Sequence, residues 1–265
     1  MIHIKNSLPR TLAVHVRLFF HTGCLFILLL TGWPEELYAG TLYQVSRVID
    51  GDTVLLDNGQ RIRLLGINAP EISHRNKPAE LGGIRAKDYL NKVLLKRLIH
   101  LEYDVERRDH YGRQLAHIYL DNGEHVNVAM LRLGLATLSI HPPNLQHARV
   151  LAAAEYVAQE LGLGLWSQVS HQLRPINQLS AGLANKWGRY EAVVVKTKRF
   201  KQGTQLHLSD NSYVWISASD YEYFQALKTY VGRRVELRGW PKQRGGYWSI
   251  KLIHSSQLIM KPDRY

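Results

Sequence analysis

Cysteine is nearly absent from this chain, and its absence removes two kinds of chemistry. The single cysteine among 265 residues, Cys24, lies within the first 39 residues, which do not look like part of the fold. The rest of the chain can therefore form no disulfide and carries no thiolate nucleophile. There are 13 histidines, but no His-x-x-His, His-Glu-x-x-His or mixed Cys/His spacing occurs, so we expect no zinc site. We interpret four of the histidines as surface or strand residues rather than metal ligands: His110, His117, His125 and His147.

A long hydrophobic run is also lacking. The main candidate, residues 18–30, is a mostly apolar run of 13 residues, whereas a membrane-spanning helix needs about 20. Basic residues precede this run, and Ala39 follows as a plausible cleavage residue. The layout predicts a signal peptide over residues 1–39 and export to the periplasm or beyond. The alternative is an uncleaved N-terminal anchor. After cleavage we expect no stable membrane insertion.

Acidic residues are in deficit. The chain has 34 Lys and Arg against 22 Asp and Glu, which gives a net charge of +12 and a pI near 9.8. Such a balance favours an anionic partner, for example nucleic acid or a membrane surface. Apolar residues make up 45% of the chain, which is enough to bury a core and excludes a disordered tail. The length allows one large domain or two modest ones.

Residues 40–167 are predicted to form a first domain, a β-barrel with helices. Their apolar patterns change from alternation to helical spacing and back. The predicted strands are 42–49, 53–56, 60–66, 98–105 and 113–120, and the predicted helices are 79–97, 126–133 and 145–161. Three strands, a helix and two strands is the order of a five-stranded OB barrel. We therefore expect an α+β fold in which the helices complete the core of the barrel.

A polar segment, residues 168–186, is predicted to link this domain to a second one at residues 187–260. There the order of three strands, a helix and two strands recurs. The predicted strands are 187–197, 205–208, 213–217, 234–240 and 247–254, and the predicted helix is 219–230. We interpret this domain as a second, smaller OB-like β-barrel.

Positive charge is concentrated in the C-terminal domain. Residues 40–170 hold 15 basic and 14 acidic residues, whereas residues 186–265 hold 15 basic and 6 acidic ones. Cations there alternate with aromatic rings, a combination that binds single-stranded nucleic acid through its phosphates and bases. The candidate substrate contacts are Arg199, Lys201, Arg238, Trp240, Arg244 and Trp248. The alternative is that the tryptophans belong to a core and the cations only face solvent.

The stretch 48–71 carries most of the chemistry. Two strand-like runs meet at an Asp-Asn-Gly turn, residues 57–59, which is a strong hairpin signal. Folding this hairpin brings the acidic bend at Asp52 close to Arg63 and Glu71. A carboxylate suits a hard cation, a guanidinium suits a phosphate, and a glutamate can hold a water molecule. The hairpin is therefore predicted to form a site that cuts phosphodiesters.

Three separate blocks occur in one order along the first domain. They are residues 48–71, the run Asp109-His110-Tyr111-Gly112-Arg113, and the ending Gly164-Leu165-Trp166-Ser167. Together they resemble the staphylococcal-type thermonucleases over residues 41–167. The resemblance implies an SNase-like OB barrel and a calcium-dependent endonuclease that hydrolyses DNA and RNA and leaves 3′-phosphates.

The resemblance implies a calcium site in the hairpin. Asp52 matches a calcium carboxylate, Asn68 takes the place of a second one, and the backbone carbonyl of Ala69 matches a third ligand. Asp50 lies close enough in sequence to support these ligands. Calcium accepts oxygen ligands in irregular geometry. Because Asn68 stands where the family usually has aspartate, the site loses one negative charge and calcium should bind more weakly.

The resemblance also implies the catalytic residues. Glu71 matches the glutamate that positions or deprotonates the attacking water, and Arg63 and Arg113 match the arginines that hold the scissile phosphate. Tyr111, with His110 beside it, is the implied contact to a neighbouring phosphate. These assignments predict in-line attack by a held water molecule on a phosphate clamped by two guanidinium groups.

We therefore expect an exported nuclease with DNA and/or RNA as its partner, and no protein partner is implied. One alternative is a catalytically weak nucleic-acid-binding protein, impaired by Asn68. Another is a twin-barrel binder of oligosaccharide or peptide. Taken singly, the Asp-Gly-Asp bend is compatible with a simple turn, and Arg113 with an ion pair to Glu102 or Asp104. Residues 137–142 lack the tyrosines that line the family's nucleotide pocket, which leaves His141 as a candidate replacement.

Overall fold

The computed structural model describes residues 41–73, 79–209 and 211–262, all within one compact unit, Tyr38–Tyr265. The predicted signal peptide lies outside the described residues. In the described part of the chain, no helix is both long and apolar enough to cross a membrane.

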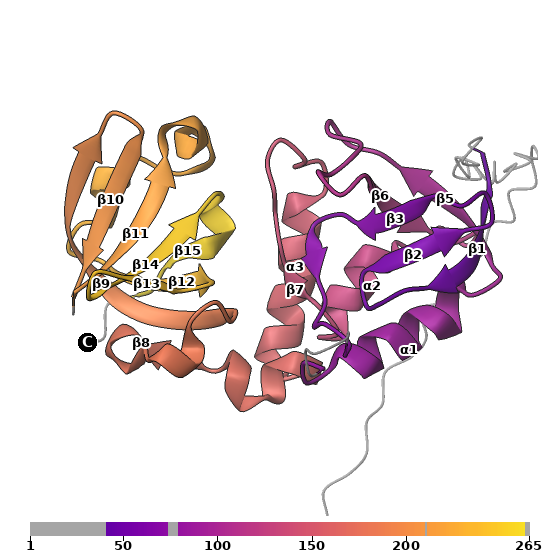
Figure 1. Ribbon diagram of the computed structural model, residues 1–265, viewed down its shortest axis with the longest axis horizontal. Helices are drawn as coiled ribbons and strands as arrows, with labels where there is room; N and C mark the ends of the chain where they lie inside the picture. The colour runs from indigo at the N-terminus through magenta and orange to yellow at the C-terminus, as the bar shows by residue number, and fades with distance from the viewer. Residues whose placement is uncertain (1–40, 74–78, 210, 263–265) are drawn as a thin grey trace, which may run out of the picture. The chain divides into compact units, whose positions relative to one another are not determined.

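Five strands of the N-terminal half close into a barrel (Figure 1). They are β1 (Tyr43–Val48), β2 (Thr53–Leu56), β3 (Arg61–Leu64), β5 (Leu98–Glu102) and β6 (Gln114–Tyr119), in the order β1-β2-β3-β6-β5. The β2–β3 hairpin turns at Gly59, whose φ of +81° glycine adopts without steric cost. β3 and β6 are parallel, whereas the other neighbours are antiparallel. The predicted five-stranded OB barrel is confirmed.

Three helices complete the core of this barrel. They are α1 (Gly83–Leu94), α2 (Val126–Arg132) and α3 (Ala148–Glu160). Helix α1 buries Ala86, Leu90 and Leu94 on one face, and these side chains join the barrel residues in a single hydrophobic core. The predicted start of this helix at residue 79 is too early, because Gly82 has a left-handed backbone with φ of +99°. A short ladder joins β4 (Ile67–Asn68) to β7 (Thr137–Leu138).

The segment predicted as a linker is packed onto the C-terminal strands. After η1 (Gly164–Ser167) it contains η2 (Val169–His171), β8 (Leu173–Pro175), η3 (Ile176–Gln178) and η4 (Ala181–Leu183). Strand β8 pairs in parallel with β9, and Ile176 is buried in the C-terminal core. This segment therefore contributes to the C-terminal fold, while the domain boundaries themselves stay predictions.

The C-terminal strands form one eight-stranded sheet with its own hydrophobic core. With β8 attached to β9, the order is β13-β14-β11-β10-β9-β12-β15. The strands are β9 (Gly188–Phe200), β10 (Gly203–Leu208), β11 (Ser212–Ser217), β12 (Arg234–Gly239), β13 (Lys242–Arg244), β14 (Tyr247–Leu252) and β15 (Leu258–Met260), with η7 (Ser255–Gln257) before the last. As in the barrel, the third strand of the meander (β11) pairs in parallel with a later strand, β14. The strand connectivity is compatible with the OB-like fold predicted for this domain, but the path of the sheet ends in two edge strands, β13 and β15, whereas that of the barrel closes.

The predicted helix at residues 219–230 is wrong. The segment forms two 3₁₀ helices, η5 (Ala218–Tyr223) and η6 (Leu227–Tyr230), with extended backbone at Phe224 between them. The residues that pack against the core are Tyr221, Phe224, Leu227 and Tyr230. Their spacing of three residues fits the 3.0-residue turn of a 3₁₀ helix better than the 3.6-residue turn of an α-helix.

Candidate active site

The strand register places Arg63 beside Asp52 at one end of the β2–β3 hairpin. Thr53 pairs with Arg63 across the two strands, so the guanidinium reaches the residue that precedes Thr53. Arg63 Nη2 lies 3.0 Å from Asp52 Oδ2 and donates to Asn68 Oδ1 over 3.2 Å. Its Nη1 donates to the Ile67 carbonyl over 2.9 Å. The guanidinium is therefore held in one orientation by two of the residues predicted to bind metal.

Asp52 is a buried carboxylate, with 7% of its surface exposed. Burial, opposed by the charge of Arg63 and assisted by that of Asp50, raises the pKa of Asp52 to about 6. Its Oδ2 accepts the Ala69 N–H over 2.9 Å, and its own N–H donates to Asp50 Oδ1 over 3.1 Å. A carboxylate in this environment is stabilised in its charged form by a positive partner, and Arg63 supplies one.

Arg113 reaches the same place from the loop before β6. Its Nε donates to Asp109 Oδ2 over 2.8 Å, and its backbone N–H donates to Asp109 Oδ1 over 2.9 Å. Its Nη1 lies 3.5 Å from Thr53 Oγ1, and the Thr53 hydroxyl donates to Asp52 Oδ1 over 3.1 Å. A continuous chain of polar contacts therefore connects the two arginines through Thr53 and Asp52.

A cavity of about 570 Å³ brings the predicted residues together. Its wall contains Arg63 and Arg113 together with Asn68 and His110, and we call it the arginine cleft. Tyr111 lies just outside this wall and is 72% exposed, with its ring centroid 5.5 Å from the central carbon of the Arg113 guanidinium. The arginine cleft therefore offers two fixed guanidinium groups to a bound anion.

Glu71 does not line the arginine cleft. The residue is exposed, and its backbone N–H donates to Glu80 Oε2 over 3.1 Å. Residues 74–78, which follow shortly after it, are outside the described residues. The structure therefore does not bring the Glu71 carboxylate together with the arginines, and its role as a base stays a prediction.

The side chains around Asp52 offer oxygen atoms, the ligand type that a hard cation such as calcium prefers. Asp52 Oδ2 and Asn68 Oδ1 converge on one positively charged nitrogen, Arg63 Nη2, at 3.0 and 3.2 Å. Over residues 41–73, 79–209 and 211–262, however, no group of three or more His, Cys, Asp or Glu side chains is placed to hold a metal. A calcium ion here would depend on one carboxylate, one amide oxygen and the Ala69 carbonyl, so the predicted site is a weak one.

Sequence reasoning missed residues that position this cleft. Thr53 and Asp109 both hold Arg113, and Asp109 was available as a signal because it opens the run Asp109-His110-Tyr111-Gly112-Arg113. Asn144, which also lines the cleft, is 9% exposed and binds both the N–H and the carbonyl of Glu106, over 2.7 and 2.9 Å. No local pattern marks Asn144, because its partner lies 38 residues away.

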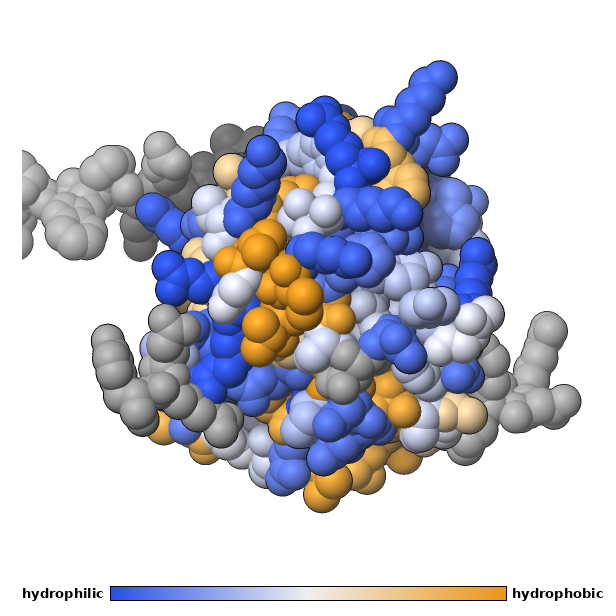
Figure 2. Space-filling view, turned by 90° about the vertical axis from the view of Figure 1, so that its left-hand side faces the viewer, coloured by the Kyte–Doolittle hydropathy of each residue, from blue (hydrophilic) through white to orange (hydrophobic). Residues whose placement is uncertain are grey.

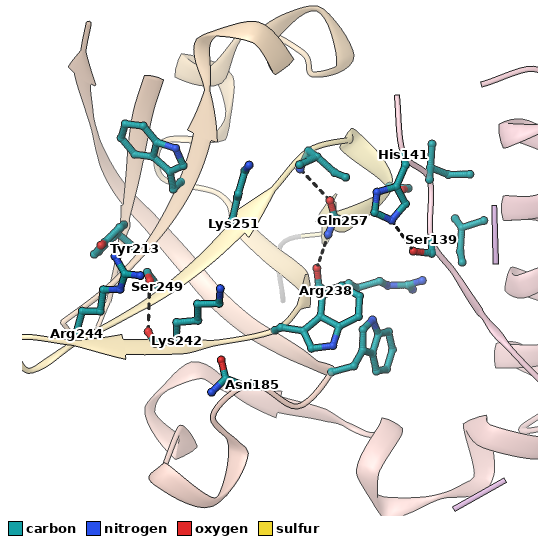
Figure 3. A pocket seen from close by; sticks show the side chains of 17 residues that line it. Ser139, His141, Asn185, Tyr213, Arg238, Lys242, Arg244, Ser249, Lys251 and Gln257 are labelled. Atoms are coloured by element: carbon teal, nitrogen blue, oxygen red, sulfur yellow. Dashed lines mark hydrogen bonds between the residues drawn. The ribbon is translucent and has the colours of Figure 1, made fainter. Parts of the chain in front are cut away.

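A second cavity of about 640 Å³ contains some of the predicted C-terminal contacts (Figure 3). Trp240 and Arg244 line it, and we call it the sheet groove. Arg238 also lines it, but its guanidinium donates to Glu155 Oε2 over 2.5 Å and to Glu236 Oε1 over 2.8 Å. A guanidinium in such contacts is already engaged by the protein, so its predicted role in substrate binding has no geometric support.

The remaining predicted contacts lie elsewhere. Arg199 lines a different cavity, Lys201 is exposed in the turn after β9, and Trp248 is half-buried. The alternative in which the tryptophans form a core does not hold for Trp240, which is 38% exposed. Figure 2 shows the side of the C-terminal sheet, where hydrophilic residues surround a small hydrophobic patch.

Three histidines gather on the barrel. His125 Nε2 lies 3.1 Å from His117 Nδ1, and the His147 ring centroid lies 4.6 Å from that of His117. Burial, together with the charges of the neighbouring histidines, lowers the pKa of His117 to about 3 and that of His125 to about 4. His147 Nε2 contacts Glu102 Oε2 at 2.9 Å. Of the two positions predicted for His117, surface or strand, the structure shows the strand: His117 lies on β6 and is 2% exposed.

A closed five-stranded barrel that holds two oriented arginines in one cleft defines an OB-fold protein suited to bind a phosphodiester. Residues 61–168 match the family model described as staphylococcal nuclease homologue. The chain is 39% identical over 132 residues to the thermonuclease of Staphylococcus intermedius, which covers 49% of this chain and 78% of that protein. It is 32% identical over 144 residues to endonuclease YncB of Bacillus subtilis, which covers 52% of this chain and 68% of that protein. The chain belongs to the staphylococcal nuclease family and is a hydrolase of the nuclease class.

Proposed function

We propose that this protein is an exported, calcium-dependent endonuclease that hydrolyses DNA and/or RNA and leaves 3′-phosphates. The observation that carries the proposal is the convergence of Arg63 and Arg113 on one cleft, connected through Thr53 and the buried Asp52. A phosphodiester gathers negative charge on its non-bridging oxygens as it reacts, and two oriented guanidinium groups stabilise that charge.

Each predicted site residue has its own role in the proposed reaction. Arg63 and Arg113 hold the phosphate, and their partners Asp52 and Asp109 fix their orientation. Glu71, which is exposed to water and lies three residues beyond Asn68, accepts the proton of the attacking water. Tyr111 and His110 contact a neighbouring phosphate, because the Tyr111 ring lies against Arg113 and the His110 ring packs on Tyr111.

Calcium would be held by Asp52, Asn68 and the Ala69 carbonyl, with Asp50 behind them. When bound it supplies positive charge to a phosphate oxygen. With only one carboxylate among these ligands, we expect affinity in the range of roughly 10⁻⁴ to 10⁻³ M that extracellular calcium modules use. Export, which the N-terminal sequence favours, would place the enzyme where such concentrations occur.

The C-terminal sheet is proposed to hold the substrate. Its half of the chain carries the charge excess, with 15 basic and 6 acidic residues over 186–265. Trp240 and Arg244 line the sheet groove, where an aromatic ring and a cation can contact the same nucleic-acid strand. This part of the proposal rests on charge and exposure.

The direct test is digestion of labelled DNA and RNA by the purified protein, with calcium and with a chelator. Arg63→Ala and Glu71→Gln should each remove most of the activity, whereas Arg61→Ala, an exposed arginine on the same strand, should keep it. Equal digestion by all three variants would overturn the assignment of the cleft.

A second candidate function is nucleic-acid binding with little or no cleavage. Two observations favour it: Asn68 replaces a carboxylate, and Glu71 lies outside the wall of the arginine cleft. The same assay separates the two functions, since a pure binder would retain labelled strands in the presence of calcium without shortening them.

A further inference from the structure

The C-terminal sheet has one buried and one solvent-facing side, and the register shows which residues share the outer side. Leu206, Val214 and Ile250 lie side by side on β10, β11 and β14 and belong to the core. Side chains alternate along a strand, so the positions next to these three point outward. Two rows of outward positions cross strands β9, β10, β11, β14 and β13, and we call them the outer rows. They contain Lys198, Gln205, Trp215 and Lys251 in one row, and Lys196, His207, Tyr213, Ser249 and Lys242 in the other.

The outer rows hold four lysines and no carboxylate. All four lysines are exposed. His207 lies between these lysines. Desolvation lowers its pKa, and the positive charges of Lys196 and Lys198 lower it further. A surface with several cations of one sign and no acid attracts a polyanion at long range.

Aromatic rings lie among these cations. Trp215 and Tyr213 are half-buried members of the outer rows, and the Phe200 ring centroid lies 6.0 Å from that of Trp215. Rings of this kind stack with bases whose faces are free. In a duplex the base faces are already stacked on each other, so a surface of partly exposed rings and lysines selects an unpaired strand.

The sheet groove connects the outer rows to the arginine cleft. Tyr213, Trp215, Lys242 and Lys251 line its sheet side, and Ser139, His141 and Trp240 line it as well. These last three residues also line the arginine cleft. Figure 3 shows Lys242 and Lys251 on the strands at one side of the groove and Ser139 and His141 at the other. The two cavities therefore share part of their walls, and a nucleic-acid strand that leaves one can enter the other.

Buried ion pairs hold this junction in place. Arg238 Nη1 binds Glu155 Oε2 over 2.5 Å, and Arg238 Nη2 donates to Gln159 Oε1 over 2.8 Å, so β12 is tied to α3. Glu155 Oε1 in turn accepts the backbone N–H of Leu138, just before Ser139. Since Trp240 follows Arg238 by two residues, these contacts set its position between the two cavities. Arg238 thus acts as a positioning residue rather than as a substrate contact.

We propose that the outer rows and the sheet groove form a track for one unpaired nucleic-acid strand, which passes Trp240 into the arginine cleft. This inference rests on the proposed nuclease function, and it adds the single-stranded form of the substrate and its path. Lysines along the track neutralise phosphates, the rings stack with bases, and Trp240 stacks with the base at the entrance to the cleft. A strand long enough to occupy the track should be cut in preference to a substrate that fills only the cleft.

The experiment compares two double variants of equal charge change in the full protein. Lys242→Ala/Lys251→Ala removes two cations of the track, whereas Lys92→Ala/Lys228→Ala removes two exposed cations that line neither the groove nor the cleft. Each is assayed for kcat/KM on a single-stranded oligonucleotide of about 30 nucleotides, longer than the 4–16 that one OB fold covers, and on a nitrophenyl ester of a mononucleotide. The readout is the ratio of the two kcat/KM values.

For the track variant this ratio should fall about tenfold, and the salt dependence of oligonucleotide binding should weaken by about 1.4 in log–log slope, as expected for two lost phosphate contacts on a single strand. The control variant should keep the ratio of the two kcat/KM values within about twofold of wild type. Trp240→Ala should lower the ratio, and Trp240→Phe should restore it, since an aromatic face is what the entrance requires.

Separate outcomes distinguish the two proposals. If the wild-type protein hydrolyses both substrates but the two double variants behave alike, the track is wrong and the nuclease assignment stands. If it hydrolyses neither, the nuclease assignment fails, and fluorescence anisotropy with chelator present still tests the track through the loss of strand binding in Lys242→Ala/Lys251→Ala. Equal affinity for a duplex of the same length, or equal competition by polyglutamate, would also contradict the track.

Discussion

The barrel and the C-terminal sheet share a strand connectivity but differ in closure. In both, a three-stranded meander is followed by a helical segment and later strands, and the third strand pairs in parallel with a later one. The barrel closes when β5 pairs with β1, whereas the corresponding seam of the sheet is open, with no ladder between β12 and β14 among the described residues. The same connectivity thus supports an enclosed core with chemistry at one rim, and a sheet with a broad outer face.

The two regions also treat their cations differently. In the arginine cleft each arginine has a carboxylate partner, Asp52 for Arg63 and Asp109 for Arg113, which fixes its orientation. In the outer rows of the sheet the cations are lysines, and the rows contain no carboxylate. Oriented guanidinium groups suit one phosphate held for reaction, while flexible ammonium groups suit a strand that moves past them. The two arrangements fit the two steps that we propose, reaction in the cleft and capture on the sheet.

The largest effect should come from the arginine cleft. Arg113→Ala should lower kcat on DNA by about 10²- to 10³-fold, because it removes an oriented donor aimed at the reacting phosphate. Arg113→Lys should recover little of this loss, since an ammonium cannot form the two-pronged contact. Steady-state kinetics would show it. If Arg113→Lys were as active as wild type, charge alone would suffice, and the contrast between fixed and collecting cations would be lost.

The next largest effect should fall on the junction between the two regions. Arg238→Ala should destabilise the protein by about 3 kcal/mol, because it leaves the buried Glu155 without its cationic partner. Urea denaturation would measure this change. The exposed Arg244→Ala should shift the midpoint little. A loss for Arg238→Ala no larger than that for Arg244→Ala would show that the ion pair does not hold the two regions together.

Acid should destabilise the barrel through its buried histidines. Burial lowers the pKa of His117 from 6.5 to about 3 in the folded state, so the unfolded chain binds the proton first and stability falls as the pH drops below 6.5. At pH 5 the loss from His117 alone should be about 2 kcal/mol. The neighbouring His125, His147 and Glu102 face the same cluster and modulate the loss. Amide hydrogen exchange between pH 7 and 5 should therefore show loss of protection in the barrel.

In the C-terminal part, burial lowers the pKa of His171 to about 4, so protonation of the unfolded chain should cost stability over the same range, whereas the central carboxylate of the sheet responds only at lower pH. Although burial opposes it, the hydrogen bond from Arg189 and the charge of Arg238 lower the pKa of Glu236 from 4.5 to about 2. Its contribution is therefore complete above pH 4.5 and disappears only as the pH falls toward 2. His117→Gln should flatten the decline between pH 7 and 5, and the exposed His110→Gln should not. A decline in barrel protection that His117→Gln left unchanged would contradict the role of His117.

The smallest effect should be on calcium. Asn68→Asp adds a carboxylate beside Asp52 and should lower the calcium concentration for half-maximal activity by about tenfold, which corresponds to about 1.4 kcal/mol. A calcium titration of activity would measure it, with Asn58→Asp in the hairpin turn as a charge-matched control. An unchanged calcium requirement would show that Asn68 is not a ligand.

Much of the barrel could be predicted because its signals are local. Alternating apolar residues and the Asp-Asn-Gly turn define β2 and β3, and the hairpin alone brings Arg63 to Asp52. The helix at 219–230 was wrong because a three-residue spacing of apolar and aromatic side chains resembles a helical one over a short segment. An α-helix predicted for a segment that forms short 3₁₀ helices is wrong for this reason.

Contacts between distant residues were out of reach. Arg238 looked like a substrate contact because it is a cation among aromatic residues, but its partner Glu155 lies 83 residues earlier in the chain. The shared wall of the two cavities depends on Ser139, His141 and Trp240, which come from two separate parts of the fold. No sequence pattern joins these residues, because the strand register and the ion pairs of α3 bring them together.

One measurement tests the central claim that the arginine cleft cuts a nucleic-acid strand. A single-stranded DNA labelled at its 5′ end is incubated with the full protein and calcium, and the products are examined for length and for the chemical group at the new 3′ end. We expect internal cleavage that leaves 3′-phosphates, stops with chelator and is lost in Arg63→Ala. Intact DNA, or cleavage that persists unchanged in that variant, would contradict it.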